Sequence, residues 1–270
     1  MENETNFLCP VCGKPLNVEG KSLRCENKHC YDVARAGYVN LLPVQRKHSL
    51  DPGDNKEMIV SRTNVMGKGY YKPLIEAVKA LLFGASAKCV LDAGCGVGTL
   101  CGEIGLRCSD TQTYGTDISK FAVEYAAKKY KRTKFAVASS MRLPFADGFF
   151  DTVLCAFAPV YAGEFSRVTK ENGYLIRVTP AKEHLMKLKE ILYETPRENE
   201  KDETRFDGYE LVSEKKVTGF FTGDRQAMAD LVKMTPYYYH TSEEDFKKLE
   251  KESEPLTVNT AFDVRVFRKQ

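Results

Sequence analysis

The chain has 270 residues, a hydrophobic content of 43% and a formal net charge of +3 at pH 7. Its length suits one large or two modest domains, and its apolar content suits a sizeable core. It holds no apolar run of about eighteen residues, which excludes a membrane-spanning helix, and its acidic N-terminus lacks the features of a signal peptide. We therefore expect a cytoplasmic protein whose nine cysteines stay reduced.

Several candidate metal ligands lie close together near the N-terminus. Cys9 and Cys12 form a C-x2-C pair, and Cys25 is followed by His29. This spacing is typical of a structural Zn²⁺ site to which each of two turns contributes two ligands. About thirty residues cannot bury enough core to fold alone, so a metal ion is physically reasonable here. Cys30 competes with His29 as the fourth ligand, and spacing alone does not choose between them. Free cysteines beside a surface histidine are the alternative.

A polar segment follows this unit. Residues 45–54 contain a Pro-Gly pair, which predicts a loop. A helix is expected to begin at Glu57 and to be interrupted near Gly67, and a second helix to cover Ile75–Phe83.

A glycine-rich turn is the central feature of the chain. The apolar run Cys89–Leu91 predicts a buried parallel strand, and residues 99–107 predict a helix. Such a turn brings backbone N–H groups close to a ligand. Its D-x-G-x-G-x-G spacing resembles motif I of the S-adenosylmethionine-dependent methyltransferases, and an ordinary Rossmann turn for another nucleotide is the alternative. The cofactor candidates of the turn are Asp92, Gly94, Gly96, Val97 and Gly98.

A second acid supports this interpretation. Asp117 follows a strand expected at residues 111–116, where an acid accepts hydrogen bonds from a ribose diol. A third strand is expected at Lys134–Ala138. Many relatives of the fold then have an acid that contacts adenine, and here Ser139 stands in its place, which predicts a weaker, uncharged contact.

The fourth strand, expected at Phe150–Phe157, ends in a sequence that narrows the chemistry. Exocyclic-amine methyltransferases often have [DNS]-P-P-[YF] at this point, and this chain has F-A-P-V. The difference argues against methylation of an exocyclic amine and is compatible with methylation of a ring nitrogen.

The C-terminal half is expected to complete the sheet. An Asn-Gly turn at 172–173 should lead into a strand at Tyr174–Thr179, and the polar residues 194–207 should form a mobile loop. The alternating segments Leu211–Phe221 and Thr257–Phe267 should pair as the last strands, with a helix at Arg225–Lys233 between them. Three consecutive tyrosines at 237–239 are expected to pack, although they are also able to stack on a flipped base.

The order of these motifs resembles one family. The C-x2-C…C-x3-H unit, GYVNLLPVQRKHSLDPGD, YKPL, LDAGCGVG and ASSMRLPF are similar to the bacterial 23S ribosomal RNA guanine-N1 methyltransferases of the RlmA type. The resemblance implies an α/β fold, with a Rossmann-like seven-stranded sheet of the class I methyltransferases and an N-terminal zinc-binding module. It also implies S-adenosylmethionine as cofactor, one structural Zn²⁺, a homodimer, and a guanine in a 23S hairpin near the peptide exit tunnel as target.

Domain limits and further site residues follow from the same resemblance. It implies a zinc-binding RNA-recognition module at residues 1–40, a linker and entry helix at 41–72, and a methyltransferase domain at 73–270. Tyr71 and His184 are the family positions that border the cofactor.

Guanine N1 must lose a proton, so a base or a well-placed acceptor is needed. Asp51 and Asp54, with His48 nearby, are candidates on the loop that joins the modules, although Asp51–Asp54 is also an ordinary β-turn sequence. Two other functions remain open at this point. One is a small-molecule methyltransferase of the same fold, and the other is a catalytically silent RNA-binding relative.

Overall fold

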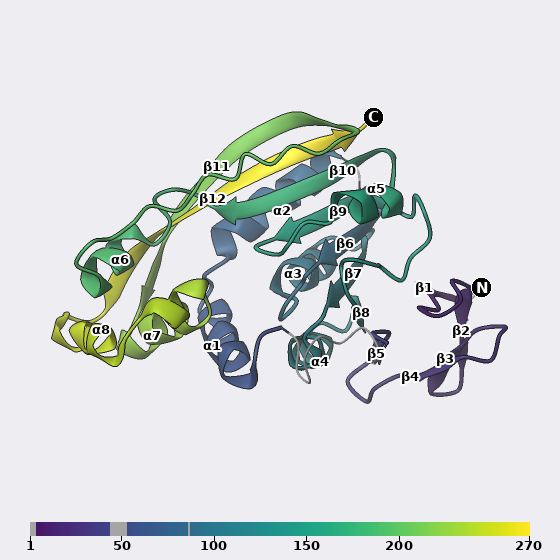
Figure 1. The fold of residues 1–270 in the computed structure, drawn as a ribbon, viewed down its shortest axis with the longest axis horizontal. Helices are drawn as coiled ribbons and strands as arrows, with labels where there is room; N and C mark the ends of the chain where they lie inside the picture. The colour runs from purple at the N-terminus through teal and green to yellow at the C-terminus, as the bar shows by residue number, and fades with distance from the viewer. Residues whose placement is uncertain (1–3, 44–52, 86) are drawn as a thin grey trace.

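The computed structural model describes residues 4–43, 53–85 and 87–270. Two β-sheets organise them, a small one near the N-terminus and a large one that carries the rest (Figure 1). The small sheet is antiparallel and has the strand order β1-β2-β3-β4. Its strands are β1 (Glu4–Leu8), β2 (Pro15–Glu19), β3 (Ser22–Arg24) and β4 (Cys30–Asp32). Gly20, at a φ of +64°, makes the tight turn between β2 and β3.

The large sheet has the strand order β11-β12-β10-β9-β6-β7-β8-β5. Strand β12 runs antiparallel to both of its neighbours, and the other pairings are parallel. This arrangement is an open Rossmann-like sheet to which the last two strands add an antiparallel extension. Its strands are β5 (Tyr38–Asn40), β6 (Cys89–Ala93), β7 (Gln112–Asp117), β8 (Lys134–Val137), β9 (Phe150–Ala156), β10 (Thr169–Pro180), β11 (Tyr209–Gly223) and β12 (Leu256–Lys269).

Among the described residues this sheet has eight strands, one more than the seven expected. The extra strand is β5, which pairs in parallel with β8, Tyr38 lying opposite Phe135. A three-residue edge strand carries no periodic signal of its own, so its pairing depends on the tertiary structure. The N-terminal module expected at residues 1–40 therefore contributes its last three residues to the large sheet.

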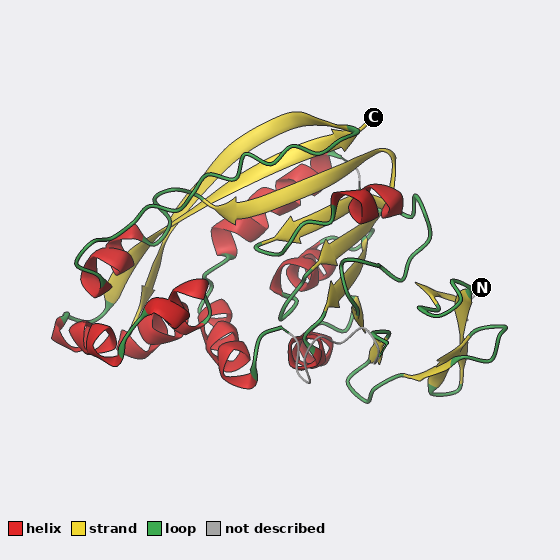
Figure 2. Ribbon diagram, viewed as in Figure 1, coloured by secondary structure: helices red, strands yellow, loops and turns green. Residues whose placement is uncertain are grey.

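Helices join the strands (Figure 2). Side-chain caps explain where four of them begin: Asn55, Ser119, Asp224 and Ser242 each accept a hydrogen bond from a first-turn backbone N–H. None of the helices in the described ranges is both long and apolar enough to cross a membrane. The helices are α1 (Lys56–Gly67), α2 (Lys72–Gly84), α3 (Thr99–Arg107), α4 (Lys120–Lys129), α5 (Ala162–Val168), α6 (Met186–Leu192), α7 (Arg225–Lys233) and α8 (Glu243–Lys248), with the 3-10 helices η2 (Pro236–His240) and η3 (Leu249–Lys251).

Two expected features of the C-terminal half take a different form. The Asn-Gly pair does not precede β10 as a turn but lies inside it as an irregularity, with Asn172 at a φ of +60°. The polar residues 194–207 have neither helix nor strand but are held against the sheet. Asp202 forms a 3.0 Å ion pair with Arg177 of β10, and its backbone oxygen accepts from Arg265 of β12 at 2.9 Å.

The small sheet is packed firmly on the large one. The Phe7 ring lies 6.0 Å from that of Tyr114 in β7 and 5.3 Å from that of Phe145, within one buried cluster. The side chain of Asn6 donates to the Tyr114 hydroxyl at 2.8 Å, and the backbone N–H of Leu8 donates to Pro144 at 2.8 Å. These contacts hold the N-terminal unit in a defined position on the main domain.

Candidate active site and zinc centre

Four side chains from two turns of the small sheet, one between β1 and β2 and the other between β3 and β4, converge on one point. The donor atoms of Cys9, Cys12, Cys25 and His29 all lie within 4.8 Å of one another. The sulfurs of Cys12 and Cys25 are 3.7 Å apart. Nδ1 of His29 lies 3.5 Å from the sulfur of Cys9 and 3.4 Å from that of Cys25. Tetrahedral zinc, with bonds of about 2.3 Å to sulfur and about 2.0 Å to nitrogen, requires separations of about 3.8 Å and about 3.5 Å. The donor set therefore fits a structural Cys3His zinc site.

The structure separates the two candidates for the fourth ligand. Cys30 begins β4 and is exposed, and its sulfur accepts from Arg24 at 3.8 Å, away from the other cysteines. Adjacent residues at a strand start point in opposite directions, which leaves His29 on the side of the metal. The Tyr31 hydroxyl lies 3.3 Å from the sulfur of Cys9 and supports that ligand from outside. Four protein ligands leave no open position for a water molecule, so the zinc is structural.

The glycine-rich turn connects β6 to α3 at the centre of the large sheet. Gly94, Gly96 and Gly98 all have positive φ, which residues with a side chain rarely adopt. A Cβ on Gly94 would lie 2.5 Å from the Cβ of Ala158, so this glycine lets the turn approach the end of β9. A Cβ on Gly96 would instead meet Nη1 of Arg62 at 3.6 Å, on the side of the turn that faces a cavity.

Asp92 is almost completely buried at the carboxyl end of β6, with 1% of its surface exposed. Oδ2 accepts a long hydrogen bond, 3.3 Å, from the backbone N–H of Cys101 in α3. Oδ1 is buried and has no hydrogen-bond partner among the described residues. Burial raises the pKa of Asp92 to about 7. A buried acceptor without a donor indicates that a ligand completes this site.

Asp117 ends β7, next to Asp92. Its carboxylate accepts from the backbone N–H groups of Gly96 and Ser119, each at 2.8 Å, and so holds the glycine turn beside the start of α4. Burial raises its pKa. Each carboxylate oxygen has a second lone pair, so both remain able to accept from a ribose diol. Ser139, just beyond the neighbouring strand β8, is half-buried, and its hydroxyl accepts from the N–H of Met141 at 3.2 Å.

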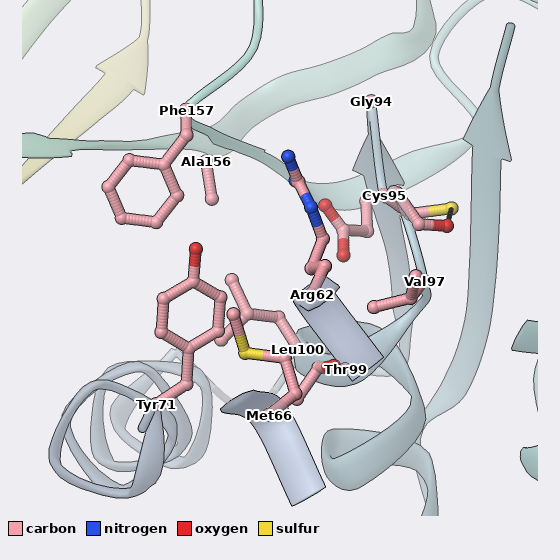
Figure 3. Close-up of a pocket in the computed structure, with 12 residues that line it drawn as sticks. Arg62, Met66, Tyr71, Gly94, Cys95, Val97, Thr99, Leu100, Ala156 and Phe157 are labelled. Atoms are coloured by element: carbon pink, nitrogen blue, oxygen red, sulfur yellow. Dashed lines mark hydrogen bonds between the residues drawn. The ribbon is translucent and has the colours of Figure 1, made fainter. Parts of the chain in front are cut away.

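A small cavity of about 30 Å³ lies over the turn (Figure 3). Tyr71 and Phe157 stack on each other at its edge, with ring centroids 5.5 Å apart and ring planes inclined by 18°. Phe157 has a φ of +56°, a strained conformation that often marks functional sites. The volume suits a small end group and not a whole nucleoside. The cavity is lined by Arg62, Met66, Tyr71, Asp92, Gly94, Cys95, Gly96, Val97, Thr99, Leu100, Ala156 and Phe157.

His184 does not line this cavity. The backbone N–H of Ala261 donates to its Nδ1 at 3.1 Å, so the neutral ring carries its hydrogen on Nε2, which donates to the Tyr70 hydroxyl at 2.9 Å. Burial lowers the pKa of His184 to about 4. Its ring packs against Phe262, which in turn contacts Tyr71 and so separates His184 from the cavity.

Of the candidate bases, only Asp54 lies within the described residues; His48 and Asp51 lie outside them. Asp54 pairs with Arg62 of α1 at 2.7 Å, and its backbone oxygen accepts from the Ser119 hydroxyl at 3.1 Å. It therefore lies beside the glycine turn.

Two residues that line the cavity, Arg62 and Phe157, were not predicted from the sequence. Arg62 reaches the cavity from a helix that precedes the turn in the chain, and no local pattern marks it. The position of Phe157 at the end of the fourth strand was the one available signal.

The donor set, the glycine turn and the buried, unpaired Asp92 fit a zinc ribbon joined to a class I S-adenosylmethionine-dependent methyltransferase. Two family models match, "RlmA, N-terminal" over residues 7–50 and "Methyltransferase domain" over residues 90–173. The chain belongs to the RlmA-type family of 23S rRNA guanine-N1 methyltransferases.

Full-length relatives show this membership. YxjB of Bacillus subtilis, provisionally assigned to the same activity, is 34% identical over 97% of this chain and 97% of its own length. The 23S rRNA (guanine(748)-N(1))-methyltransferase of Streptomyces fradiae is 32% identical over 92% of this chain and 91% of its own. Among solved structures, YcgJ of Bacillus subtilis aligns with a TM-score of 0.46 at 17% identity, covering 71% of this chain and 97% of that one.

Proposed function

We propose that this protein transfers the methyl group of S-adenosylmethionine to N1 of one guanine in 23S ribosomal RNA, in a hairpin near the peptide exit tunnel. One observation carries the proposal: the Streptomyces fradiae enzyme, which is named for N1 of guanine 748, is similar over 92% of this chain, and the chain also matches the models of the RlmA N-terminal unit and of a methyltransferase domain. A small-molecule methyltransferase would have no evident use for the zinc ribbon.

The loop after β9 supports a ring nitrogen as the target. In exocyclic-amine methyltransferases, backbone carbonyls at this position accept hydrogen bonds from the amine. Here the carbonyl of Ala158 accepts from Arg177 at 2.7 Å and from the thiol of Cys155 at 3.5 Å, so it is already engaged. The stacked pair Tyr71 and Phe157 instead presents aromatic surface beside the cavity.

Bound S-adenosylmethionine supplies an electrophilic methyl group on a sulfonium. In our proposal Asp117 binds the ribose, Ser139 contacts the adenine and Asp92 faces the methionine end. Tyr71 covers that end directly. His184 does not contact the cofactor but orients Tyr70, to which it donates a hydrogen bond, and Phe262, against which it packs. Enzymes of this kind work mainly by positioning two reactants and excluding water.

Asp54 is the proposed acceptor for the N1 proton, because it is the candidate base that lies within the described residues. Its ion pair with Arg62 offers a second role, the orientation of that arginine. The substitution Asp54→Asn separates the two roles. Loss of the base lowers kcat at saturating cofactor, whereas loss of orientation raises KM for the cofactor and leaves kcat nearly intact.

Three further points belong to the proposal. The chain is divided into a zinc-binding RNA-recognition module (1–40), a linker with an entry helix (41–72) and a methyltransferase domain (73–270). The protein works as a homodimer, which light scattering of the purified protein would test. A ribosomal RNA substrate places the reaction in the cytoplasm.

The test uses tritiated S-adenosylmethionine and deproteinised 23S RNA from a strain that lacks the enzyme. After nuclease digestion we expect the label in 1-methylguanosine with the wild type and no label with Asp92→Asn. Cofactor binding without label in RNA would favour a small-molecule methyltransferase of the same fold. RNA binding without cofactor binding would favour a catalytically silent relative.

A further inference from the structure

Arg62 and Asp92 are the charged side chains among the described residues that line the cavity over the glycine turn. They come from different parts of the fold, Arg62 from α1 and Asp92 from the end of β6. Figure 3 shows the Arg62 side chain reaching into the space between Phe157 and the turn at Gly94 and Cys95. The described lining of the cavity therefore offers a cation and an acid to a ligand.

The Arg62 guanidinium is held in place from outside the cavity. One nitrogen, Nη2, donates to the carboxylate of Asp54 at 2.7 Å and to the backbone oxygen of Met234 at 3.0 Å. Nη1 faces the turn, 3.6 Å from where a Cβ on Gly96 would lie. Nε is buried and has no hydrogen-bond partner within the described ranges. The guanidinium is thus oriented while part of its donor capacity stays unused.

The cavity also contains an unused acceptor, the buried Oδ1 of Asp92. An unused donor on a cation and an unused acceptor on an acid in one small space suit a zwitterion, whose carboxylate and ammonium pair with them. The volume of about 30 Å³ suits the end of a molecule. The methionine end of S-adenosylmethionine has this chemistry.

We propose that Arg62 binds the α-carboxylate of S-adenosylmethionine and is therefore a cofactor-positioning residue of this enzyme. The inference rests on the proposed function, because it assumes that cofactor. The charges around the site also favour a carboxylate contact by Arg62. Among the described residues around the turn, the acids Asp54, Asp92 and Asp117 outnumber the cation Arg62, and without Arg62 these acids would repel the cofactor carboxylate.

Helix α1 is also held on α7 by side chains other than Arg62. Ser61 and Asn64 of the same helix each donate to Asp230 of α7 at 2.9 Å. Replacement of Arg62 should therefore leave the helix in place, which makes a binding experiment informative.

The experiment compares two ligands on the zinc-loaded, full-length protein by calorimetry. One is S-adenosylmethionine, and the other is its decarboxylated form, which keeps the sulfonium and the ammonium but lacks the carboxylate. Hydrogen bonds to charged groups predict that the wild type binds the complete cofactor about 10- to 100-fold more tightly. In Arg62→Gln we expect the two ligands to bind with about equal affinity. Arg62→Lys should recover part of the preference for the complete cofactor. Arg107→Gln is the matched control, because Arg107 pairs on the surface with Glu76 and Glu103 and should leave the preference unchanged.

The ratio of the two affinities distinguishes a carboxylate contact from a purely structural role. If Arg62→Gln weakened both ligands equally, so that the preference remained, the inference would be overturned while the proposed function stood. If the wild type bound neither ligand, the proposed function and the inference would fail together.

Discussion

Asp92 should reduce the stability of the cofactor-free protein above pH 7, and Asp92→Asn should remove that cost. With 1% of its surface exposed, the side chain loses nearly all of its hydration, and its pKa rises from 3.8 to about 7. A difference of about 3 pH units corresponds to about 4 kcal/mol at 1.36 kcal/mol per unit.

The sign follows from proton linkage. Between pH 4 and pH 7 the folded protein keeps the Asp92 proton that the unfolded chain has lost, so the free energy of unfolding falls as the pH rises through this range. The cost is absent below pH 4 and complete above about pH 7. Asn has nearly the same shape and no charge, so the substitution should gain up to about 4 kcal/mol at pH 8 and little at pH 4.5.

Urea unfolding of the zinc-loaded, cofactor-free proteins at several pH values measures this directly. The difference between wild type and Asp92→Asn cancels the titration of groups distant from Asp92, such as the zinc ligands, which both proteins share. Parallel stability curves for the two proteins would refute the reasoning, because they would mean that Asp92 is no harder to ionise in the fold than in the unfolded chain.

Four further results are expected. Because the cofactor ammonium favours ionised Asp92, cofactor affinity should fall up to about tenfold per pH unit below pH 7 in titration calorimetry, and Asp92→Asn should flatten this dependence. Cys12→Ser should release zinc and abolish RNA binding in filter assays, whereas Cys30→Ser should retain both. His184→Ala should cost about 3 kcal/mol in urea unfolding, because it leaves a buried donor, the Ala261 N–H, and a buried acceptor, the Tyr70 hydroxyl, without a partner. Phe7→Ala should cost about 3 kcal/mol and expose the N-terminal unit to proteolysis.

Each expectation has an outcome that contradicts it. A flat pH dependence in the wild type would remove the ammonium contact from Asp92. Zinc loss in Cys30→Ser alone would reverse the assignment of the fourth ligand. If His184→Ala kept full stability but lost cofactor, the histidine would contact the cofactor directly. Unchanged proteolysis of Phe7→Ala would mean that other contacts hold the small sheet.

The parts that sequence predicted well are those with local signals. The cysteine spacing predicted the zinc site apart from the choice between His29 and Cys30, because tetrahedral coordination demands two ligand pairs on two turns. The glycine turn between Cys89–Ala93 and Thr99–Arg107 was predictable because positive φ values require glycine at alternate positions.

The remainder depends on contacts between distant segments. Strand β5 is too short to show a hydrophobic periodicity in the sequence. It forms by pairing with β8, which lies far away along the chain. Arg62 acts from a helix about thirty residues before Asp92, so chain order conceals their proximity. His184 matched a family position, but its burial and its pairing with Tyr70 become evident only in three dimensions.

The most direct test of the central claim is reverse transcription of 23S RNA treated with this protein and S-adenosylmethionine. A methyl group on N1 removes the hydrogen-bond donor that guanine uses in base pairing, so the polymerase should stop. We predict one new stop, one nucleotide before a single guanine in a hairpin loop, absent with Asp92→Asn. Methyl transfer to RNA without any stop would mean that the methyl group is not on the pairing edge, and the assignment to N1 would be wrong.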